Sequence, residues 1–188
     1  MIMKTPSQSS PLDNLMVRAR QYAEFCLRSS GRMSLTLLLV GTDGPMVLEL
    51  DKMTGERDKN NFVNMARLAC IAYNATACVI AMEAWETTIK PGEPLDLTVP
   101  PSQAIDRHEV VSLIGEDHKQ RKHQSLGIVR NNNGSIAGLS ESEIKTVDYG
   151  AEDNTGGRFT HIMPRKVPVT AIQALAKTML EEAFIKTT

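Results

Sequence analysis

The sequence predicts an α+β fold, in which a mainly antiparallel sheet of about five to seven strands carries three helices. Two observations predict it. Apolar residues recur at helical spacing in three long segments, and the chain between these segments alternates short apolar runs with turn residues. The expected order of elements is α-β-β-α-β-β-β-β-α. The chain has 188 residues, of which 41% are hydrophobic, so we expect a single domain over residues 12–188 behind a flexible tail, residues 1–11.

The first helix is expected directly after Pro11, with Ser10 or Asp13 as its cap. Apolar residues continue at steps of three and four as far as Leu27, which places them on one stripe of the helix. Gly31 then ends the helix, because a glycine just past the last turn adopts the left-handed conformation without strain.

A hairpin and a second helix follow. Residues 33–40 are rich in leucine and too few for a helix, so we expect a buried strand there. Residues 41–45 supply a turn, and residues 46–50 supply the second strand. The second helix is predicted over residues 58–73, where apolar side chains again share one stripe, and Asn74 ends it.

The central strand is predicted over residues 76–85, because this segment is apolar on both faces, as in a strand covered from both sides. Residues 86–106 contain four prolines and form a long connection, which in a compact domain is either functional or mobile. Strands are expected at residues 108–114 and 122–130, joined by a polar turn over residues 115–120.

The last third of the chain is predicted to hold a short strand, a hairpin and a helix. The short strand covers residues 135–139, residues 143–149 and 158–163 form the hairpin, and the amphipathic helix covers residues 168–184. The residues of this helix that are expected to face inward are Ile172, Leu175, Ala176, Met179, Leu180 and Ala183.

Charge and cysteine content place the protein in the cytoplasm and exclude two classes of function. There are 21 basic and 22 acidic residues. The chain as a whole is therefore neither a general nucleic-acid binder nor an acidic protein that mimics nucleic acid. Cys26, Cys70 and Cys78 are odd in number and show no C-x-x-C spacing, which favours buried thiols over disulfides. The start of the chain lacks an apolar signal segment and the longest aliphatic run, residues 35–40, is too short for a bilayer, so we expect no membrane contact.

Glu83 is the one ionisable residue of the central strand. Burying an unpaired carboxylate costs several kcal/mol, so Glu83 is expected at the strand end or beside a cation. It is either a catalytic or metal-binding carboxylate or an ordinary strand-end residue that faces water or an arginine. Trp85 shares its face by the two-residue period of strands and is either a recognition surface or a half-buried cap of the core.

The segment after the proline-rich loop brings an arginine between two carboxylates. Asp106, Arg107 and Glu109 could form an arginine clamp suited to a phosphate or carboxylate ligand, with Ser102 nearby. We expect Arg107 to pair with Glu83, which would make one polar spot at the edge of the sheet.

These residues carry a resemblance to a known family. The succession Glu83-Ala-Trp85, Pro101-Ser102, then Asp106-Arg107-x-Glu109-Val-Val and Glu116 resembles a family of uncharacterised small prokaryotic cytoplasmic proteins. Its members share an E-A-W strand followed by a P-S…D-R-x-E-V strand. The resemblance covers roughly residues 13–140 and implies a prokaryotic, plasmid or phage origin and a similar α+β domain, but no activity. The chain after about residue 140 departs from the pattern.

Three histidines and a glutamate after the proline-rich loop are the residues whose spacing bears on a metal site. His108, Glu116, His118 and His123 fall within a short stretch, but neither H-E-x-x-H nor paired C-x-x-C is present. We therefore expect no metal site and no cofactor, and we expect His118 and His123 to be solvated turn residues.

Residues 118–123 form the densest basic segment. Lys119, Arg121 and Lys122 could contact nucleic-acid phosphates, or they could be the solvated edge that keeps strands from aggregating.

The function that these observations favour is a non-catalytic interaction or regulatory domain, acting with a protein partner or as a homo-oligomer. The chain lacks a catalytic signature, and its last helix is suited to docking. The alternative is a divalent-metal-dependent hydrolase or phosphodiesterase in which Glu83, Asp106 and Glu109 hold the ion and Arg107 stabilises the developing charge. A weaker alternative is nucleic-acid contact through residues 118–123.

Overall fold

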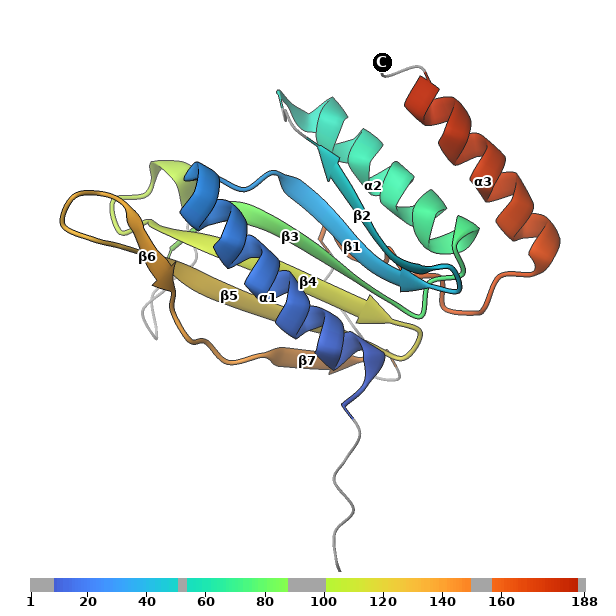
Figure 1. The fold of residues 1–188 in the computed structure, drawn as a ribbon, viewed down its shortest axis with the longest axis horizontal. Helices are drawn as coiled ribbons and strands as arrows, with labels where there is room; N and C mark the ends of the chain where they lie inside the picture. Colours follow the sequence, from blue (N-terminus) through green and yellow to red (C-terminus); the bar gives the residue numbers. More distant parts are fainter. Residues whose placement is uncertain (1–8, 51–53, 88–100, 150–156, 186–188) are drawn as a thin grey trace, which may run out of the picture.

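The computed structural model describes residues 9–50, 54–87, 101–149 and 157–185, and in these it has three helices and one mainly antiparallel sheet of seven strands (Figure 1). The predicted fold class and order of elements are confirmed. The elements are α1 (Pro11–Ser30), β1 (Leu35–Gly41), β2 (Gly44–Leu50), α2 (Glu56–Ala72), β3 (Ala77–Glu86), the 3-10 helix η1 (Pro101–Gln103), β4 (His108–Asp117), β5 (Gln120–Arg130), β6 (Ile136–Leu139), β7 (Lys145–Asp148) and α3 (Thr170–Ile185). Most of the predicted tail and of the proline-rich loop lies outside the described residues.

The sheet has the strand order β2-β1-β3-β4-β5, and two short strands share the outer side of β5. β6 pairs with the end of β5, along Ile128–Arg130, and β7 pairs with its start, along Gln120–His123. The centre of the sheet is β3, which pairs antiparallel with β1 on one side and with β4 on the other. This position explains why its sequence is apolar on both faces.

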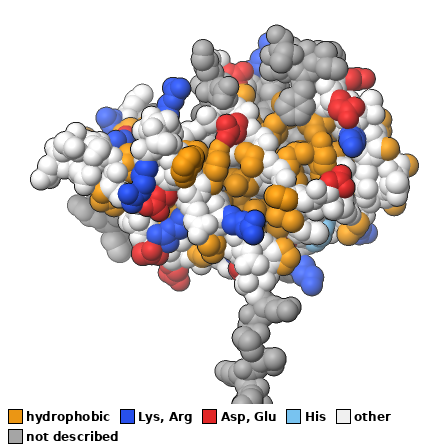
Figure 2. Space-filling model, viewed as in Figure 1, with side chains coloured by type: hydrophobic (Ala, Val, Ile, Leu, Met, Phe, Trp, Pro, Cys, Tyr) orange, Lys and Arg blue, Asp and Glu red, His pale blue; other side chains and the backbone are white. Residues whose placement is uncertain are grey.

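One face of the sheet is covered by α1, which packs across β3 and β4. The helix begins with a capping box, in which the Ser10 hydroxyl accepts from the Asp13 amide and the Asp13 carboxylate accepts from the Ser10 amide, so both predicted caps are used. It ends as predicted at Gly31, whose φ is 74°. Beside α1, exposed apolar side chains gather over β1 and β2 in Figure 2. Val47 of β2 is half-exposed.

The opposite face is covered by α2, and α3 packs alongside α2 (Figure 1). Strand alternation divides the core between the two faces: Leu37 and Leu39 of β1 face α2, whereas Leu38 faces α1. Asn74 follows α2 with a φ of 45°, in the left-handed conformation expected there. Among the described helices, none has the length and apolar character needed to cross a membrane.

Two predicted boundaries are wrong near the β4–β5 turn. β4 continues to Asp117, and the turn is confined to the residues between Asp117 and Gln120. Gly115 is not a turn residue; it lies in β4 beneath α1, where a Cβ atom would come within 2.6 Å of the Met16 sulfur and 2.9 Å of a Leu12 methyl. The glycine therefore permits the close approach of helix and strand.

The predicted final hairpin and the inward face of the last helix also need correction. β7 pairs with β5, and residues 158–163, all described, form no strand. Of the α3 residues expected inside, Ala176 and Leu180 are buried, but Ile172, Leu175 and Met179 are 48%, 58% and 47% exposed. The apolar arc of α3 is wider than the part that α2 covers, which is why half of it faces outward.

Candidate functional site

The sequence-predicted polar spot lies at the end of β3, on the face that α1 covers. The register places Trp85 opposite Glu109, and Glu83 two residues along, so their side chains share one face. Together with Ala84 and Ile128 they line a cavity of about 90 Å³. That is room for about three water molecules at roughly 30 Å³ each, and it is too small for an organic ligand.

Glu83 and Arg107 do not form the expected ion pair. The Glu83 carboxylate accepts a hydrogen bond from the backbone amide of Met33, in the chain that leaves α1. The Arg107 guanidinium instead lies 4.9 Å from the centre of the Trp85 ring and donates to the backbone carbonyl of Ser102. Arg107 directly precedes His108, which pairs with Glu86 at the end of β3. From this position its guanidinium reaches the Trp85 ring rather than the Glu83 carboxylate.

The other predicted carboxylates are engaged or exposed as well. Glu109 accepts two hydrogen bonds from Arg130, from Nε at 2.9 Å and from Nη2 at 2.7 Å. Asp106 is exposed. Within the described part of the chain, no three His, Cys, Asp or Glu side chains are grouped so as to hold a metal ion. Glu83 and Glu109 line the same small cavity, but Asp106 does not join them in the group of three that the metal-hydrolase alternative requires.

The basic segment is divided by strand alternation. Lys119 is exposed in the turn, where the Asp117 carboxylate accepts from the Lys119 and Gln120 amides at 2.7 and 2.9 Å. Arg121 faces the α2 side of the sheet, whereas Lys122 faces the α1 side and pairs with Asp13. The three basic residues therefore do not form one surface for nucleic-acid phosphates.

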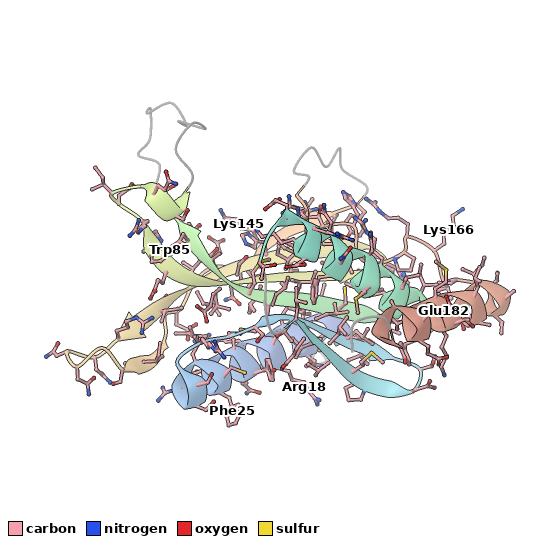
Figure 3. The ribbon with its side chains drawn as sticks, turned by 90° about the horizontal axis from the view of Figure 1, so that it is seen from above. Arg18, Phe25, Trp85, Lys145, Lys166 and Glu182 are labelled. Carbon is pink, nitrogen blue, oxygen red and sulfur yellow. The ribbon has the colours of Figure 1, made fainter. Side chains whose placement is uncertain are left out.

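A larger cavity, of about 310 Å³, lies on the α2 side of the sheet, over β4, β5 and β7. Its walls follow from the register: Ile114, His123 and Lys145 are aligned across the three strands, and in the next row Arg121 stands opposite Val147. Figure 3 shows Lys145 on this side of the sheet. The remaining lining residues, Gly157 and Thr160, come from the segment before α3.

Glu116 fixes that segment against the sheet. The residue is 1% exposed, and its carboxylate accepts hydrogen bonds from three consecutive backbone amides, of His161, Ile162 and Met163, at 2.7, 2.8 and 3.0 Å. These bonds take the amides that a strand would have used, which explains why the predicted strand over residues 158–163 does not form. Three charge-assisted bonds also offset the cost of burying the charge.

His123 is a half-buried cavity residue and not a solvated turn residue. Its Nε2 atom lies 3.1 Å from the Ser112 hydroxyl. Burial lowers the pKa of the His123 imidazole; Glu86 acts in the opposite direction, and Lys145 and Arg121 lower the pKa further. His118 is also partnered, with Nδ1 at 2.7 Å from the Pro164 carbonyl.

The Ser112–His123 pair joins two neighbouring strands in the interior of the sheet. Ser112 lies in the middle of β4, which pairs with β3 on one side and β5 on the other, so the neighbouring strand amides are used in the sheet. Stabilising a tetrahedral oxyanion requires amide donors that are not already engaged. Sequence reasoning missed Ser112, Lys145 and Thr160 as site residues and considered Glu116 only as a metal ligand. The alternation of Arg121 and His123 within β5 is the one signal that could have indicated the cavity.

No family model, no curated protein and no solved structure matches this chain.

Proposed function

We propose that the protein is a non-catalytic cytoplasmic interaction domain whose chains associate in pairs through α3. The observation that carries this proposal is the outward apolar stripe of α3. Ile172, Leu175 and Met179 follow at spacings of three and four residues and are about half exposed. Val167 and Val169, just before the helix, are 63% and 67% exposed. We call these five residues the α3 surface.

The occupant that the charges favour is a second copy of the chain. Lys166 stands just before α3, and Glu182 lies in its last turns (Figure 3). Glu181 precedes Glu182, and all three residues are exposed. This distribution is the reverse of what the helix dipole favours, since acidic groups stabilise the start of a helix and basic groups its end. A helix running antiparallel alongside would bring opposite charges together at both ends.

A two-fold axis midway between Leu175 and Ala176 would satisfy both the apolar and the charged groups. In that arrangement Ile172 of one copy lies opposite Met179 of the second, and Glu182 of each copy lies opposite Val169 of the other copy, three residues along the chain from its Lys166. The α3 surface of one chain packs against the α3 surface of the other, as an isologous interface requires.

The expected affinity is modest. Full burial of such side chains contributes about 1.5–3 kcal/mol each, so five half-exposed residues per copy contribute on the order of 10 kcal/mol. Association itself costs about 4–15 kcal/mol. The surplus is at most about 6 kcal/mol, so we expect a concentration-dependent dimer with a dissociation constant of roughly tens of micromolar or weaker.

The test is sedimentation equilibrium of the full chain from 1 to 500 µM at low salt. The wild-type chain should dimerise, and Leu175→Glu should remain monomeric over this range, because two carboxylates would face each other at the axis. Val17→Glu is the matched control, since Val17 on α1 is also 58% exposed and should leave the dimer unchanged.

Exchanging the charges at the two ends of α3 provides a second test of the dimer. Lys166→Glu should weaken the dimer, and combining it with Glu181→Lys and Glu182→Lys should restore it. A wild-type chain that stays monomeric at 500 µM, or a dimer that Val17→Glu or Val47→Glu dissociates while Leu175→Glu does not, would overturn the proposal.

A further inference from the structure

We propose that the outer edge of β2, together with the groove between β2 and α2, binds an extended peptide as an additional strand of the sheet. The peptide carries apolar residues at alternate positions and a basic residue between two of them. This role is separate from self-association, because none of the five residues of the α3 surface lines the groove.

The two edges of the sheet are built differently. One is formed by β6 and β7, which have four residues each and therefore offer little backbone to a further strand. The other is β2, which has seven residues and follows β1 in an unbroken register (Figure 1). β2 contains no lysine and no bulge, two features that commonly keep an edge strand from pairing. Its edge is therefore suited to strand addition.

Pro45 shows which backbone groups of β2 face outward. It lies in a ladder pair with β1, and because proline has no N–H this pair is not a hydrogen-bonded one. Alternation along the antiparallel ladder then places the N–H and C=O groups of Val47 and Glu49 on the outer side. Within the part of the chain that the structure describes, no backbone hydrogen bond joins these two residues to a further segment. Two donors and two acceptors therefore face outward at the spacing of an extended chain.

A groove lies on the α2 side of this edge. Its volume is about 530 Å³, within the roughly 300–1,000 Å³ typical of ligand sites. Arg57 and Asp58, in the first turn of α2, line it with opposite charges, so the groove favours apolar over charged side chains. The apolar residues that line it are Leu48 and Leu50 of β2 and Phe62, Met65 and Leu68 of α2.

The register determines which side chains of an added strand enter the groove. Directly opposite residues of an antiparallel pair point to the same face of the sheet. Residues opposite Leu48 and Leu50 would therefore point into the groove, where apolar side chains fit. The residue between them would stand opposite Glu49.

Glu49 favours a basic residue at that position. It is exposed, and its carboxylate accepts a hydrogen bond from the Tyr22 hydroxyl of α1, a neutral partner that leaves the negative charge in place. A lysine opposite Glu49 would form a cross-strand pair of opposite charges. The backbone of β2 thus selects an extended chain, and its side chains select an alternating, basic one.

The test uses the peptide acetyl-Thr-Leu-Lys-Leu-Thr-Leu-Thr-amide, whose lysine stands opposite Glu49 in an antiparallel alignment. Titrated into the full chain, it should saturate with a dissociation constant below about 1 mM. Amide hydrogen exchange should slow at Val47 and Glu49, whereas Met46 and Leu48, whose amides already face β1, should be protected with or without peptide.

Two N-methylated peptides test the main-chain hydrogen bonds. A methyl group on the backbone nitrogen of the lysine should weaken binding at least about tenfold, because it removes a donor that faces Glu49 and separates the strands. A methyl group on the backbone nitrogen of the central leucine points away from β2 and should change the affinity less than about twofold.

Matched protein variants test the groove. Asn61→Trp should weaken binding at least about fivefold, since Asn61 lines the groove and an indole there would fill it. Asn60→Trp is the control, because Asn60 is also exposed on α2 but does not line the groove. An unchanged amide spectrum outside α2 and β2 shows that both variants fold. Leu175→Glu should bind the peptide as the wild type does, which separates this result from that of the dimer test.

The proposal would be overturned by a lack of saturable binding up to 5 mM, by equal binding of the two methylated peptides, or by equal effects of the two tryptophan variants. Loss of binding in Leu175→Glu would place the peptide on the α3 surface instead. Slow exchange of the Val47 and Glu49 amides in the free chain would show that the edge is already covered. If that protection rises with chain concentration, the occupant is a second copy of β2 and not a peptide.

Discussion

At the scale of single residues, two glutamates of the sheet, Glu83 exposed and Glu116 buried, differ in how their carboxylates obtain partners. Glu83, the residue that stands out in the sequence, is satisfied by one backbone amide, of Met33. Glu116 is satisfied by three and holds the segment before α3 on the sheet. Sequence patterns identify a charged residue in an apolar strand, but they do not indicate which backbone amides will reach it, because those amides come from distant parts of the chain.

Glu116→Gln should therefore destabilise the fold. The neutral amide is a weaker acceptor, and its NH₂ group would face backbone donors, so we expect a loss of about 2–3 kcal/mol. Urea denaturation should show a lower midpoint with an unchanged slope. Glu143→Gln, at an exposed position, is the control and should change stability by less than about 0.5 kcal/mol. An equal effect of both substitutions would contradict the anchoring role of Glu116.

His123 should make stability depend on pH in a defined window. Its pKa is lowered in the folded protein, so its contribution is fully present above the unfolded-state pKa, near 6.5, and is lost as pH falls through the lower folded value. Unfolding free energy measured between pH 7.5 and 5 should fall, and His123→Gln should remove part of that fall.

His108→Gln, at an exposed imidazole, should leave the pH dependence intact. The carboxylates with lowered pKa, among them Glu56 at about 2, lose their contribution as pH falls below the unfolded-state carboxyl pKa, near 4, which is under the measured range. A pH profile of His123→Gln that matches the wild type would refute the assignment.

At the scale of elements, helix ends were predictable and strand ends were less so. Caps act through neighbouring residues, so Ser10, Gly31 and Asn74 could be assigned from the sequence. The start of the turn before β5 could not be assigned in this way. Gly115 is predicted as a turn residue, but its role is to let α1 approach β4 closely. The outward half of α3 was missed for a related reason: periodicity defines an apolar arc but not how much of it a neighbour covers.

Gly41→Ala should destabilise the hairpin end of β1. A Cβ atom there would overlap the Tyr73 carbonyl oxygen, which also accepts from the Thr42 amide at 3.1 Å. We expect a loss of about 1–3 kcal/mol from this overpacking, seen as a lower thermal midpoint. Gly157→Ala, whose Cβ would meet a Thr160 methyl at 3.7 Å and no other atom of the described residues within 4 Å, should cost less than about 0.5 kcal/mol. Equal midpoints for the two variants would exclude the predicted clash.

At the scale of the whole molecule, the sheet separates two cores, and the cysteines report on both. Cys70 and Cys78 are at most 1% exposed in the core under α2, whereas Cys26 is partly exposed beside the core under α1. A hydrogen bond with Cys70, together with burial, raises the pKa of Cys78 well above its usual range. Burial also raises the pKa of Cys26.

Labelling with a thiol-reactive disulfide at pH 7.5 should show one fast and two slow thiols in the native protein. The fast phase should disappear in Cys26→Ser, and the two slow thiols should react together at the rate of global opening. Unequal rates for Cys70 and Cys78 would show instead that the α2 core opens in parts.

The sequence by itself determined the α+β class, the order of the elements and most helix ends, because these depend on periodicity and on contacts between near neighbours. Only the tertiary structure decided the partners of Glu83 and Arg107, the division of the basic segment between two faces, and the cavity beside Lys145. Each of these depends on strand register and on which face a helix covers, and those are set by contacts between residues far apart in the chain.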